Sequence, residues 1–361
     1  MSDFPLPRAG LPTPALLIDV AAMDRNIAAM AEFARAHGVA LRPHAKTHKS
    51  GEIARRQIAA GAAGICCAKL AEAEALAADG VGDIHLTSPV VTPSAIARLA
   101  ELNRRIAVSV VLDHPDNARM LAEGVDAPLR VLIDVDPGSH RTGVTSPAAA
   151  VALAGAIAAT GTLKLAGVQY YCGSHQHIQS LAHRRAAIEE RTDYLRTVLA
   201  AVREARFEVP VVTGGGTGTF AIDAALGVFT ELQVGSYVFL DREYQDCELA
   251  GPRFEPALFV DATVVSANTP GMVTIDAGLK AFATDAGVPV VLAGAPAASR
   301  YAFTGDEHGA LLGDDLPGLG GRVTLMPPHC DPTVNLYDRY HVLEGDVITR
   351  SWRVTARGCS S

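Results

Sequence analysis

One lysine of this sequence stands among other basic side chains at the end of a short apolar run. Residues 42–50 read RPHAKTHKS and directly follow the apolar residues 39–41. In an extended chain the side chains of His44, Lys46 and His48 point to the same face. Cationic neighbours lower the pKa of a lysine, and a neutral amine attacks a carbonyl carbon to form a Schiff base. The segment predicts Lys46 as such a nucleophile, although a basic cluster is more typical of a solvated loop or a phosphate contact.

A second stretch with chemical potential is rich in glycine. Residues 213–219 read TGGGTGT, and glycines such as Gly215 and Gly216 let a backbone approach an anion and aim several N–H groups at it. Thr217 and Thr219 add hydroxyl donors. Because the stretch lacks the lysine of a P-loop and the spacing of a dinucleotide fold, it favours a monophosphate over ATP or NAD. A flexible turn is the alternative.

The elements that must position these residues alternate between strand and helix. Apolar runs with strand character are separated by Ala-, Leu-, Glu- and Arg-rich segments of helical periodicity. The predicted strands are 39–43, 64–67, 84–87, 106–112, 129–134, 163–171, 209–213 and 232–239. The predicted helices include 23–36, 52–60, 70–78, 93–102, 147–159 and 184–204. Eight such units in about 200 residues predict an α/β fold, a (β/α)8 TIM-type barrel.

A ninth apolar run, 15–20, is one too many for the barrel. After Tyr244 helical periodicity disappears and strand-like stretches with Gly and Pro turns follow, at 257–266, 272–276, 288–292, 322–326 and 347–354. The economical interpretation uses the spare strand in a second, mainly β domain. We therefore expect the barrel to span 21–244 and the β-domain to combine 1–20 with 245–361.

Chemistry in such barrels lies at the carboxyl ends of the strands. Lys46 follows strand one there, and the glycine-rich stretch follows strand seven. Arg141 follows strand five, and Tyr171 ends strand six. Tyr237, within strand eight, offers a hydroxyl to the same pocket. A Schiff-base lysine opposite a monophosphate cradle describes pyridoxal 5'-phosphate, whose aldehyde and phosphate need anchors on opposite sides of a ring.

Composition limits the partners. The chain has 361 residues, 49% hydrophobic and 19% charged, with a formal net charge of -8. This charge argues against nucleic acid, since phosphate backbones require concentrated Lys and Arg. The N-terminus lacks a secretory pattern, no apolar run reaches about 18 residues, and the six cysteines show no CxxC spacing. We expect a cytoplasmic protein with reduced thiols, a small-molecule partner and no membrane association.

Four motifs together resemble the D-threonine aldolase and D-serine dehydratase family of alanine racemase-like, fold-type III pyridoxal-phosphate enzymes. They are RPHAKTHK at 42–49, GGGTG at 214–218, DEHG at 306–309 and PHCDPT at 328–333. The resemblance runs from about Thr13 to Gly358. It implies a (β/α)8 barrel with a β-domain, in a homodimer.

The same resemblance implies roles for individual residues. Lys46 carries the cofactor as a Schiff base, and Arg141 and Tyr171 lie near its ring. Gly216 and Thr217 help to bind the phosphate.

The fourth motif contains a pair with metal-ligand character. His329 and Asp331 are two residues apart, so on an extended segment both face one site while Cys330 faces away. An imidazole nitrogen and a carboxylate oxygen suit Mn²⁺, Mg²⁺ or Zn²⁺, although such a pair alone is more often a surface hydrogen bond. The family resemblance favours a metal site here, in the β-domain. By this resemblance, the position of Asp331 is a cysteine in the related dehydratases, whereas the aldolases of the family resemble this sequence in having aspartate. The aspartate therefore favours an aldolase.

These features predict a carbon–carbon lyase that cleaves D-β-hydroxy-α-amino acids, of the D-threonine type, to glycine and an aldehyde by a retro-aldol reaction. His177, or a metal-bound water near it, is the candidate base for the β-hydroxyl. Thr47 and Cys172 depart from the aldolase pattern. The alternatives are a D-serine or 3-hydroxy-D-aspartate dehydratase, a 3-hydroxy-D-aspartate aldolase, and a non-catalytic pyridoxal-phosphate carrier. A carrier needs neither a β-domain nor His329 and Asp331.

Overall fold

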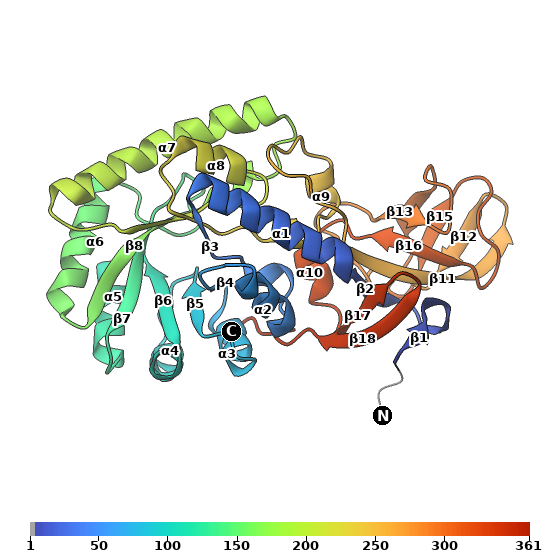
Figure 1. The fold of residues 1–361 in the computed structure, drawn as a ribbon, viewed down its shortest axis with the longest axis horizontal. Helices are drawn as coiled ribbons and strands as arrows, with labels where there is room; N and C mark the ends of the chain where they lie inside the picture. Colours follow the sequence, from blue (N-terminus) through green and yellow to red (C-terminus); the bar gives the residue numbers. More distant parts are fainter. Residues whose placement is uncertain (1–3) are drawn as a thin grey trace.

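The computed structural model describes residues 4–361 and contains two β-sheets side by side (Figure 1). Eight parallel strands form one sheet, and helices cover its outside; ten strands form the other. The predicted (β/α)8 barrel with a second, mainly β domain is confirmed. Of the segment 1–20 assigned to the β-domain, residues 1–3 lie outside the described residues.

The barrel sheet contains all eight predicted strands. In spatial order they are β3 (Ala40–Leu41), β10 (Glu231–Leu232), β9 (Val211–Gly214), β8 (Leu163–Tyr170), β7 (Leu129–Asp134), β6 (Ala107–Leu112), β5 (Asp83–Leu86) and β4 (Ile65–Cys67). A parallel bridge between His44 and Cys66 brings the first and last strands together, and the Cys66 amide donates to the Pro43 carbonyl at 2.8 Å. The predicted strand 232–239 is wrong beyond its first residue, because Ser236–Val238 form a 3-10 helix, η4.

The outer helices of the barrel are α1 (Val20–His37), α2 (Gly51–Ala59), α3 (Leu70–Ala78), α4 (Pro93–Arg105), α5 (Pro115–Gly124), α6 (Pro147–Thr160), α7 (Leu181–Glu204) and α8 (Phe220–Leu226). Five of the outer helices, α1, α4, α5, α6 and α7, begin at a side chain that accepts a hydrogen bond from the first turn. The Thr92 hydroxyl accepts from the Ala95 amide with Pro93 at the first position, and Ser146 and Pro147 repeat this arrangement. Within residues 4–361, no helix combines the length and apolarity that crossing a membrane requires.

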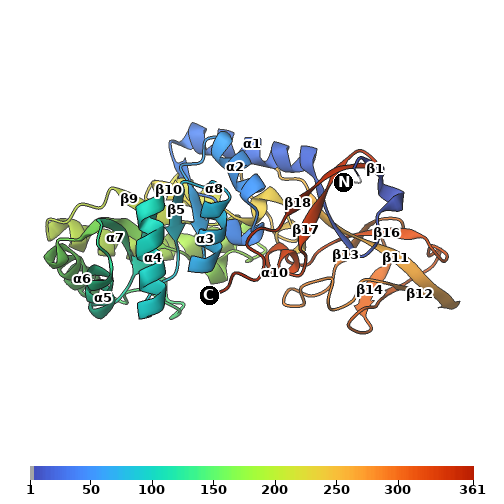
Figure 2. The ribbon, with the colours of Figure 1, turned by 90° about the horizontal axis from the view of Figure 1, so that it is seen from below.

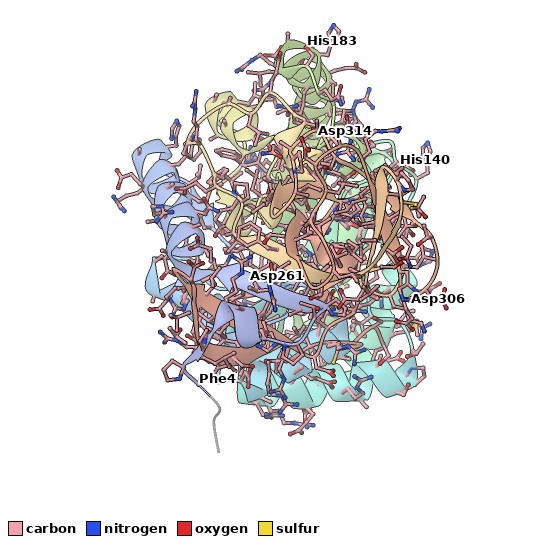
Figure 3. All side chains as sticks on the ribbon, turned by 90° about the vertical axis from the view of Figure 1, so that its right-hand side faces the viewer. Phe4, His140, His183, Asp261, Asp306 and Asp314 are labelled. Carbon is pink, nitrogen blue, oxygen red and sulfur yellow. The ribbon has the colours of Figure 1, made fainter. Side chains whose placement is uncertain are left out.

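The second sheet is antiparallel except at one strand pair. Its strands are β1 (Leu6–Pro7), β2 (Ala15–Asp19), β11 (Leu258–Thr269), β12 (Met272–Ile275), β13 (Val290–Ala293), β14 (Arg300–Phe303), β15 (Gly309–Leu312), β16 (Arg322–Met326), β17 (Arg339–Glu344) and β18 (Val347–Arg353). Strand β2 pairs with β11 on one side and, in parallel, with β17 on the other. The N-terminal segment is also tied to this sheet by a buried carboxylate, Asp261, which accepts from Arg8 (Figure 3).

The chain crosses between the two sheets at several places. Two short helices, α9 (Arg242–Gln245) and α10 (Cys330–Val334), lie where the sheets meet (Figure 1). After β18 the chain returns to the barrel, where its end lies near α3 (Figure 2). The Ala356 amide donates to the Lys49 carbonyl and the Ala71 amide to the Ser361 carbonyl, both at 2.9 Å. The C-terminal tail therefore packs against the segment that carries Lys46.

Candidate active site

A cavity of about 190 Å³ opens at the carboxyl ends of the barrel strands. Its walls come from at least five strand-to-helix connections, as the barrel geometry predicts. The lining residues are His44, Lys46, Thr47, Ala68, Thr87, Ser88, Arg141, Gln169, Tyr171, Gly216, Thr217, Gln233, Gly235, Ser236 and Tyr244. Five of the predicted cofactor-binding residues thus share one cavity: Lys46, Arg141, Tyr171, Gly216 and Thr217.

The segment around Lys46 is not extended. Ala45–Thr47 form a 3-10 helix, η2, and the His44 ring accepts a hydrogen bond from the Lys46 amide at 3.3 Å. His44 lines the cavity, but His48 is fully buried and its carbonyl accepts from Tyr340. The expectation that both histidines and Lys46 share one face is therefore wrong, because the helical turn rotates successive side chains away from strand alternation.

The Lys46 ammonium instead lies 3.1 Å from the Asp331 carboxylate. This neighbour raises the pKa of Lys46 against the opposing effect of burial. Burial by itself would raise the pKa of Asp331, but the charges of Lys46 and His329 and the hydrogen bond from Lys46 together outweigh it and lower that pKa to about 2. The predicted lowering of the Lys46 pKa is thus wrong for this arrangement, since a carboxylate and not a second cation is its partner.

The glycine-rich turn presents part of itself to the cavity. Gly215 has a φ of 67°, which a side chain disfavours, and a β-carbon there would lie 2.6 Å from the Asp223 carboxylate. Gly216 and Thr217 follow and line the cavity, whereas Gly215 does not. The Thr219 hydroxyl is also directed away, because it donates to Asp223 at 2.6 Å. Its predicted role as a hydroxyl donor to the ligand is wrong.

The Thr219 hydroxyl supports the turn from behind. It accepts from the Gly216 amide at 3.2 Å and from the Gln176 side chain at 3.1 Å. Gln176 in turn accepts from the Gly218 amide at 3.0 Å. This buried network fixes the backbone that faces the cavity, and burial raises the pKa of the Asp223 carboxyl at its base to about 7.

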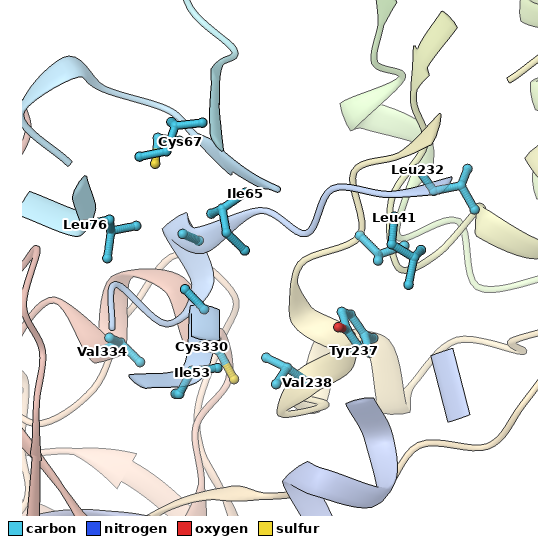
Figure 4. Packing of buried hydrophobic residues seen from close by; sticks show 14 of the residues in the cluster. Leu41, Ile53, Ile65, Cys67, Leu76, Leu232, Tyr237, Val238, Cys330 and Val334 are labelled. Atoms are coloured by element: carbon cyan, nitrogen blue, oxygen red, sulfur yellow. The ribbon is translucent and has the colours of Figure 1, made fainter. Parts of the chain in front are cut away.

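Helix η4 closes the cavity beside the glycine turn. Ser236 lines the cavity, but the Tyr237 ring is buried in the core, where its hydroxyl accepts from Gln57 at 3.1 Å (Figure 4). The Tyr237 side chain therefore cannot supply the hydroxyl predicted for it, because η4 turns that position inward. Its amide still contributes by donating to the Thr217 hydroxyl at 3.0 Å.

Arg141 and Tyr171 also line the cavity. Arg141 comes from the loop after β7, Tyr171 directly follows β8, and the guanidinium carbon lies 5.9 Å from the centre of the tyrosine ring. A cation over an aromatic face is an attractive contact at this distance. Burial raises the pKa of Tyr171, so its hydroxyl stays protonated and able to donate.

His329 and Asp331 meet at the start of α10. His329 is the residue before the helix and Asp331 lies in its first turn, so the predicted extended segment is wrong. Even so, His329 Nε2 and Asp331 Oδ1 are 3.9 Å apart. Asp331 Oδ1 is buried and makes no hydrogen bond within residues 4–361. Both atoms are therefore within reach of a shared divalent cation, whose bonds to nitrogen and oxygen are about 2.0–2.2 Å long.

Cys330 points away from these two residues. Its thiol is fully buried in the hydrophobic core near Ile53 and Val238 (Figure 4), and burial raises the pKa of the thiol well above its usual range. Its amide donates to the Asp241 carboxylate at 2.9 Å. No group of three or more metal-ligating side chains lies within the described residues. A cation here would need water or substrate to complete its coordination.

His177 lies beside Glu243 and Tyr244. Its Nε2 is 3.7 Å from the Glu243 carboxylate, and its ring centre is 4.5 Å from that of Tyr244. Burial lowers the pKa of His177 despite the Glu243 charge, which favours the neutral imidazole that a base requires. Glu243 is also 3.8 Å from His329 Nδ1. The sequence offered no local signal for Glu243.

Three other histidines lie elsewhere. His140 is exposed at the edge of the molecule, where it pairs with Asp136 at 2.9 Å (Figure 3). His175 bonds its neighbour Ser174. His308 is exposed in the turn between β14 and β15. None of them lines the cavity.

Two regions of the chain match models of known protein families. A model of the alanine racemase N-terminal domain matches residues 18–243. The chain belongs to the alanine racemase-like family of fold-type III pyridoxal-phosphate enzymes. A serine dehydratase domain model matches residues 257–343, which include the His329 and Asp331 motif.

Relatives match over nearly the whole length. D-threonine aldolase of Arthrobacter sp is 40% identical over 98% of this chain and 95% of its own. A 3-hydroxy-D-aspartate aldolase of Paracoccus denitrificans is 35% identical over 96% and 92%. The solved D-threonine aldolase of Filomicrobium marinum superposes with a TM-score of 0.96 at 38% identity over 99% and 98%. A variant of D-threo-3-hydroxyaspartate dehydratase, described as a metal-free form, superposes with a TM-score of 0.83 at 28% identity. The match covers 96% of this chain and 98% of the dehydratase chain.

The donor set of the cavity fits this family's cofactor. An amine able to form a Schiff base, that of Lys46, opens into the same space as the Gly216 backbone and the hydroxyls of Thr217 and Ser236. These groups suit an aldehyde at one side and a phosphate at the other. The chain is accordingly a D-threonine aldolase-like enzyme, a carbon–carbon lyase related to the 3-hydroxy-D-aspartate aldolases and dehydratases.

Proposed function

We propose that this enzyme cleaves D-β-hydroxy-α-amino acids with an uncharged β-substituent, of the D-threonine type, to glycine and an aldehyde. The observation that carries the proposal is the 3.1 Å pair of Lys46 and Asp331. It joins the cofactor cavity of the barrel to the His329 and Asp331 pair of the β-domain, so that one small substrate reaches both.

Pyridoxal 5'-phosphate, when bound, supplies an electron sink for the pair released from Cα. Lys46 would hold it through a Schiff base at Nζ. Gly216, Thr217 and Ser236 would bind its phosphate. Arg141 and Tyr171 also line the cavity, where they would orient the bound molecule.

His329 and Asp331 would hold a divalent cation, and the chemistry it would supply is Lewis acidity at the β-hydroxyl. The neutral imidazole of His177 accepts the β-hydroxyl proton at Nε2, and Glu243 at 3.7 Å stabilises the imidazolium that results. As the Cα–Cβ bond breaks, the carbonyl of the aldehyde forms. The electron pair of the broken bond stays at Cα. A proton returned to Cα yields glycine.

The alternative reaction breaks the Cβ–O bond. A dehydratase would need Lys46 to take the Cα proton and would release an α-keto acid and ammonia. The aldolase reaction is favoured by the aspartate at position 331, whose carboxylate faces Lys46 while the neighbouring thiol of Cys330 is buried in the core.

Charge supports an uncharged β-substituent. Glu243 and Asp285 place carboxylates 3.8 Å and 2.7 Å from His329 Nδ1. A β-carboxylate near the cation site would be repelled by both, since like charges near one another raise each other's free energy. His140, His175 and His308, which could recognise a β-carboxylate, do not line the cavity, although Arg141 does.

The test is to replace Glu243 by glutamine and compare two substrates. The proposal predicts that the ratio of kcat/KM for 3-hydroxy-D-aspartate to that for D-threonine rises in Glu243→Gln. Asp314→Asn, an exposed carboxylate of the β-domain (Figure 3), is the control. An unchanged ratio would remove the electrostatic argument for substrate choice.

A further inference from the structure

The ring of His329 has a carboxylate close to each of its nitrogens. Nδ1 lies 2.7 Å from Asp285 Oδ2, and Nε2 lies 3.9 Å from Asp331 Oδ1. A carboxylate oxygen only accepts, so Nδ1 carries the hydrogen of the shorter contact. In a neutral imidazole the lone pair is then at Nε2. Asp285 therefore determines which nitrogen faces Asp331.

The loop that carries Asp285 is anchored to the His329 turn. It connects β12 with β13 and buries Phe282 in the β-domain core. The Ala283 amide donates to the Thr333 hydroxyl at 3.0 Å, and that hydroxyl donates to the His329 carbonyl at 2.7 Å. The Thr333 side chain thus links the loop to the turn. Asp285, although exposed, is held against the His329 ring.

We propose that Asp285 is a positioning residue for the divalent cation, because it fixes the His329 tautomer and ring so that Nε2 is free to bind the metal. The inference rests on the metal site of the proposed function. A second carboxylate, Glu243, is 3.8 Å from the same Nδ1, too far for a hydrogen bond. Carboxylates that hold the second nitrogen of a ligating histidine strengthen metal binding roughly 10- to 100-fold.

The test measures cation binding to the holoenzyme without substrate. Mn²⁺ is titrated into each protein, and free Mn²⁺ is followed by electron paramagnetic resonance. Asp285→Ala is expected to raise the Kd roughly 10- to 100-fold. Asp285→Asn keeps an oxygen acceptor for the His329 Nδ1–H group, so it is expected to lose less affinity for Mn²⁺ than Asp285→Ala. Asp314→Ala should bind as the parent does, and thermal unfolding with cofactor absorbance checks that each variant is folded.

The outcomes separate two failures. If Asp285→Ala binds Mn²⁺ as tightly as the parent while His329→Ala does not bind it, the role of Asp285 is wrong and the proposed metal site stands. If His329→Ala also binds as the parent does, the metal site itself is wrong. An Asp285→Asn variant as weak as Asp285→Ala would overturn the tautomer argument, because the charge and not the acceptor would then act.

Discussion

The Lys46 ammonium and the Asp331 carboxylate form an ion pair at 3.1 Å that connects the barrel to the β-domain. Each residue has a second role in the proposed reaction, Lys46 toward the cofactor and Asp331 toward the cation. A free ammonium beside Asp331 competes with a cation for the same carboxylate. Once Lys46 is bonded to the cofactor, it no longer competes with the cation for Asp331. Cofactor binding and cation binding are therefore thermodynamically linked.

Removing the cofactor should consequently weaken cation binding. We expect the Kd for Mn²⁺ to rise on the order of tenfold in the apoprotein, because opposite charges about 4 Å apart near a protein surface interact with several kcal/mol before screening. In Lys46→Ala, which has no ammonium, the Kd should not depend on the cofactor. Calorimetric titration of both proteins, with and without pyridoxal 5'-phosphate, measures this. Equal cofactor dependence in both would show that Lys46 does not mediate the link.

Lys46 should be the site of covalent attachment. Borohydride reduction of the holoenzyme is expected to fix the cofactor on the peptide that contains Lys46, as peptide mass spectrometry would show. Lys46→Ala should retain no reducible adduct, since the Lys49 amine is committed to Glu72 at 3.1 Å. A reducible adduct at full occupancy in Lys46→Ala would place the Schiff base elsewhere.

Arg141 and Thr217 should govern cofactor retention. Arg141→Ala removes a charged group and is expected to weaken cofactor binding by about 1.5–3 kcal/mol. Thr217→Ala removes a neutral hydroxyl and is expected to weaken it by about 0.5–1.5 kcal/mol. Thr217→Ser keeps the hydroxyl that accepts from the Tyr237 amide, so it serves as the control for Thr217→Ala. Equilibrium dialysis of the cofactor gives the three values. Parent-like affinity in both Arg141→Ala and Thr217→Ala would mean that neither residue binds the cofactor.

Chelation should stop turnover without displacing the cofactor. Two protein ligands suggest moderate affinity, so EDTA is expected to abolish activity and Mn²⁺ to restore it. His329→Ala and Asp331→Ala should behave like the chelated enzyme. Cys330→Ala, whose thiol is buried in the core, should keep most of its activity and lose about 1 kcal/mol of stability, as for deletion of one buried group of methylene size. Full activity with no metal in elemental analysis would contradict the proposed metal site.

Stability should depend on pH through Asp223. Burial raises the pKa of this carboxyl to about 7 in the folded protein, against about 3.9 in an unfolded chain. Between these two pKa values the folded state binds a proton that the unfolded state does not. The contribution of Asp223 to the free energy of unfolding is therefore fully present below pH 4 and is lost as the pH rises to 7. In Asp223→Asn the loss between pH 4 and 7 should be smaller. Urea unfolding of the two apoproteins across this range decides it, and parallel curves would mean that Asp223 does not titrate there.

The barrel was predictable because its signals are local. Strand β7 and helix α3 have the predicted boundaries, since buried parallel strands and amphipathic helices are readable from a few adjacent residues. Helices α5 and α8 and strands β14 and β15 were not predicted. Strands β14 and β15 have four residues each and α8 has seven, so few periods are present for a pattern to stand out. Helix α5, at 10 residues, is no shorter than the predicted α3, and length does not explain why it was missed.

The site was predictable where a motif or the end of a barrel strand carried it, as Arg141 and Tyr171 show for strand ends. Lys46, Gly216, Thr217 and the pair of His329 and Asp331 stand in recognisable motifs, and the structure brings them together. Asp285 has no motif and lies 44 residues from the histidine it contacts. Only the packing of the loop between β12 and β13 on α10 places it there, and such tertiary contacts leave no local pattern.

The enzyme is proposed to break the Cα–Cβ bond of a D-β-hydroxy amino acid. The most direct measurement incubates the holoenzyme and Mn²⁺ with D-threonine and identifies the products by chromatography and carbonyl trapping. We predict equal amounts of glycine and acetaldehyde, with neither product from L-threonine. An α-keto acid and ammonia from D-threonine, with no glycine, would contradict the account and assign the site to the dehydratase reaction.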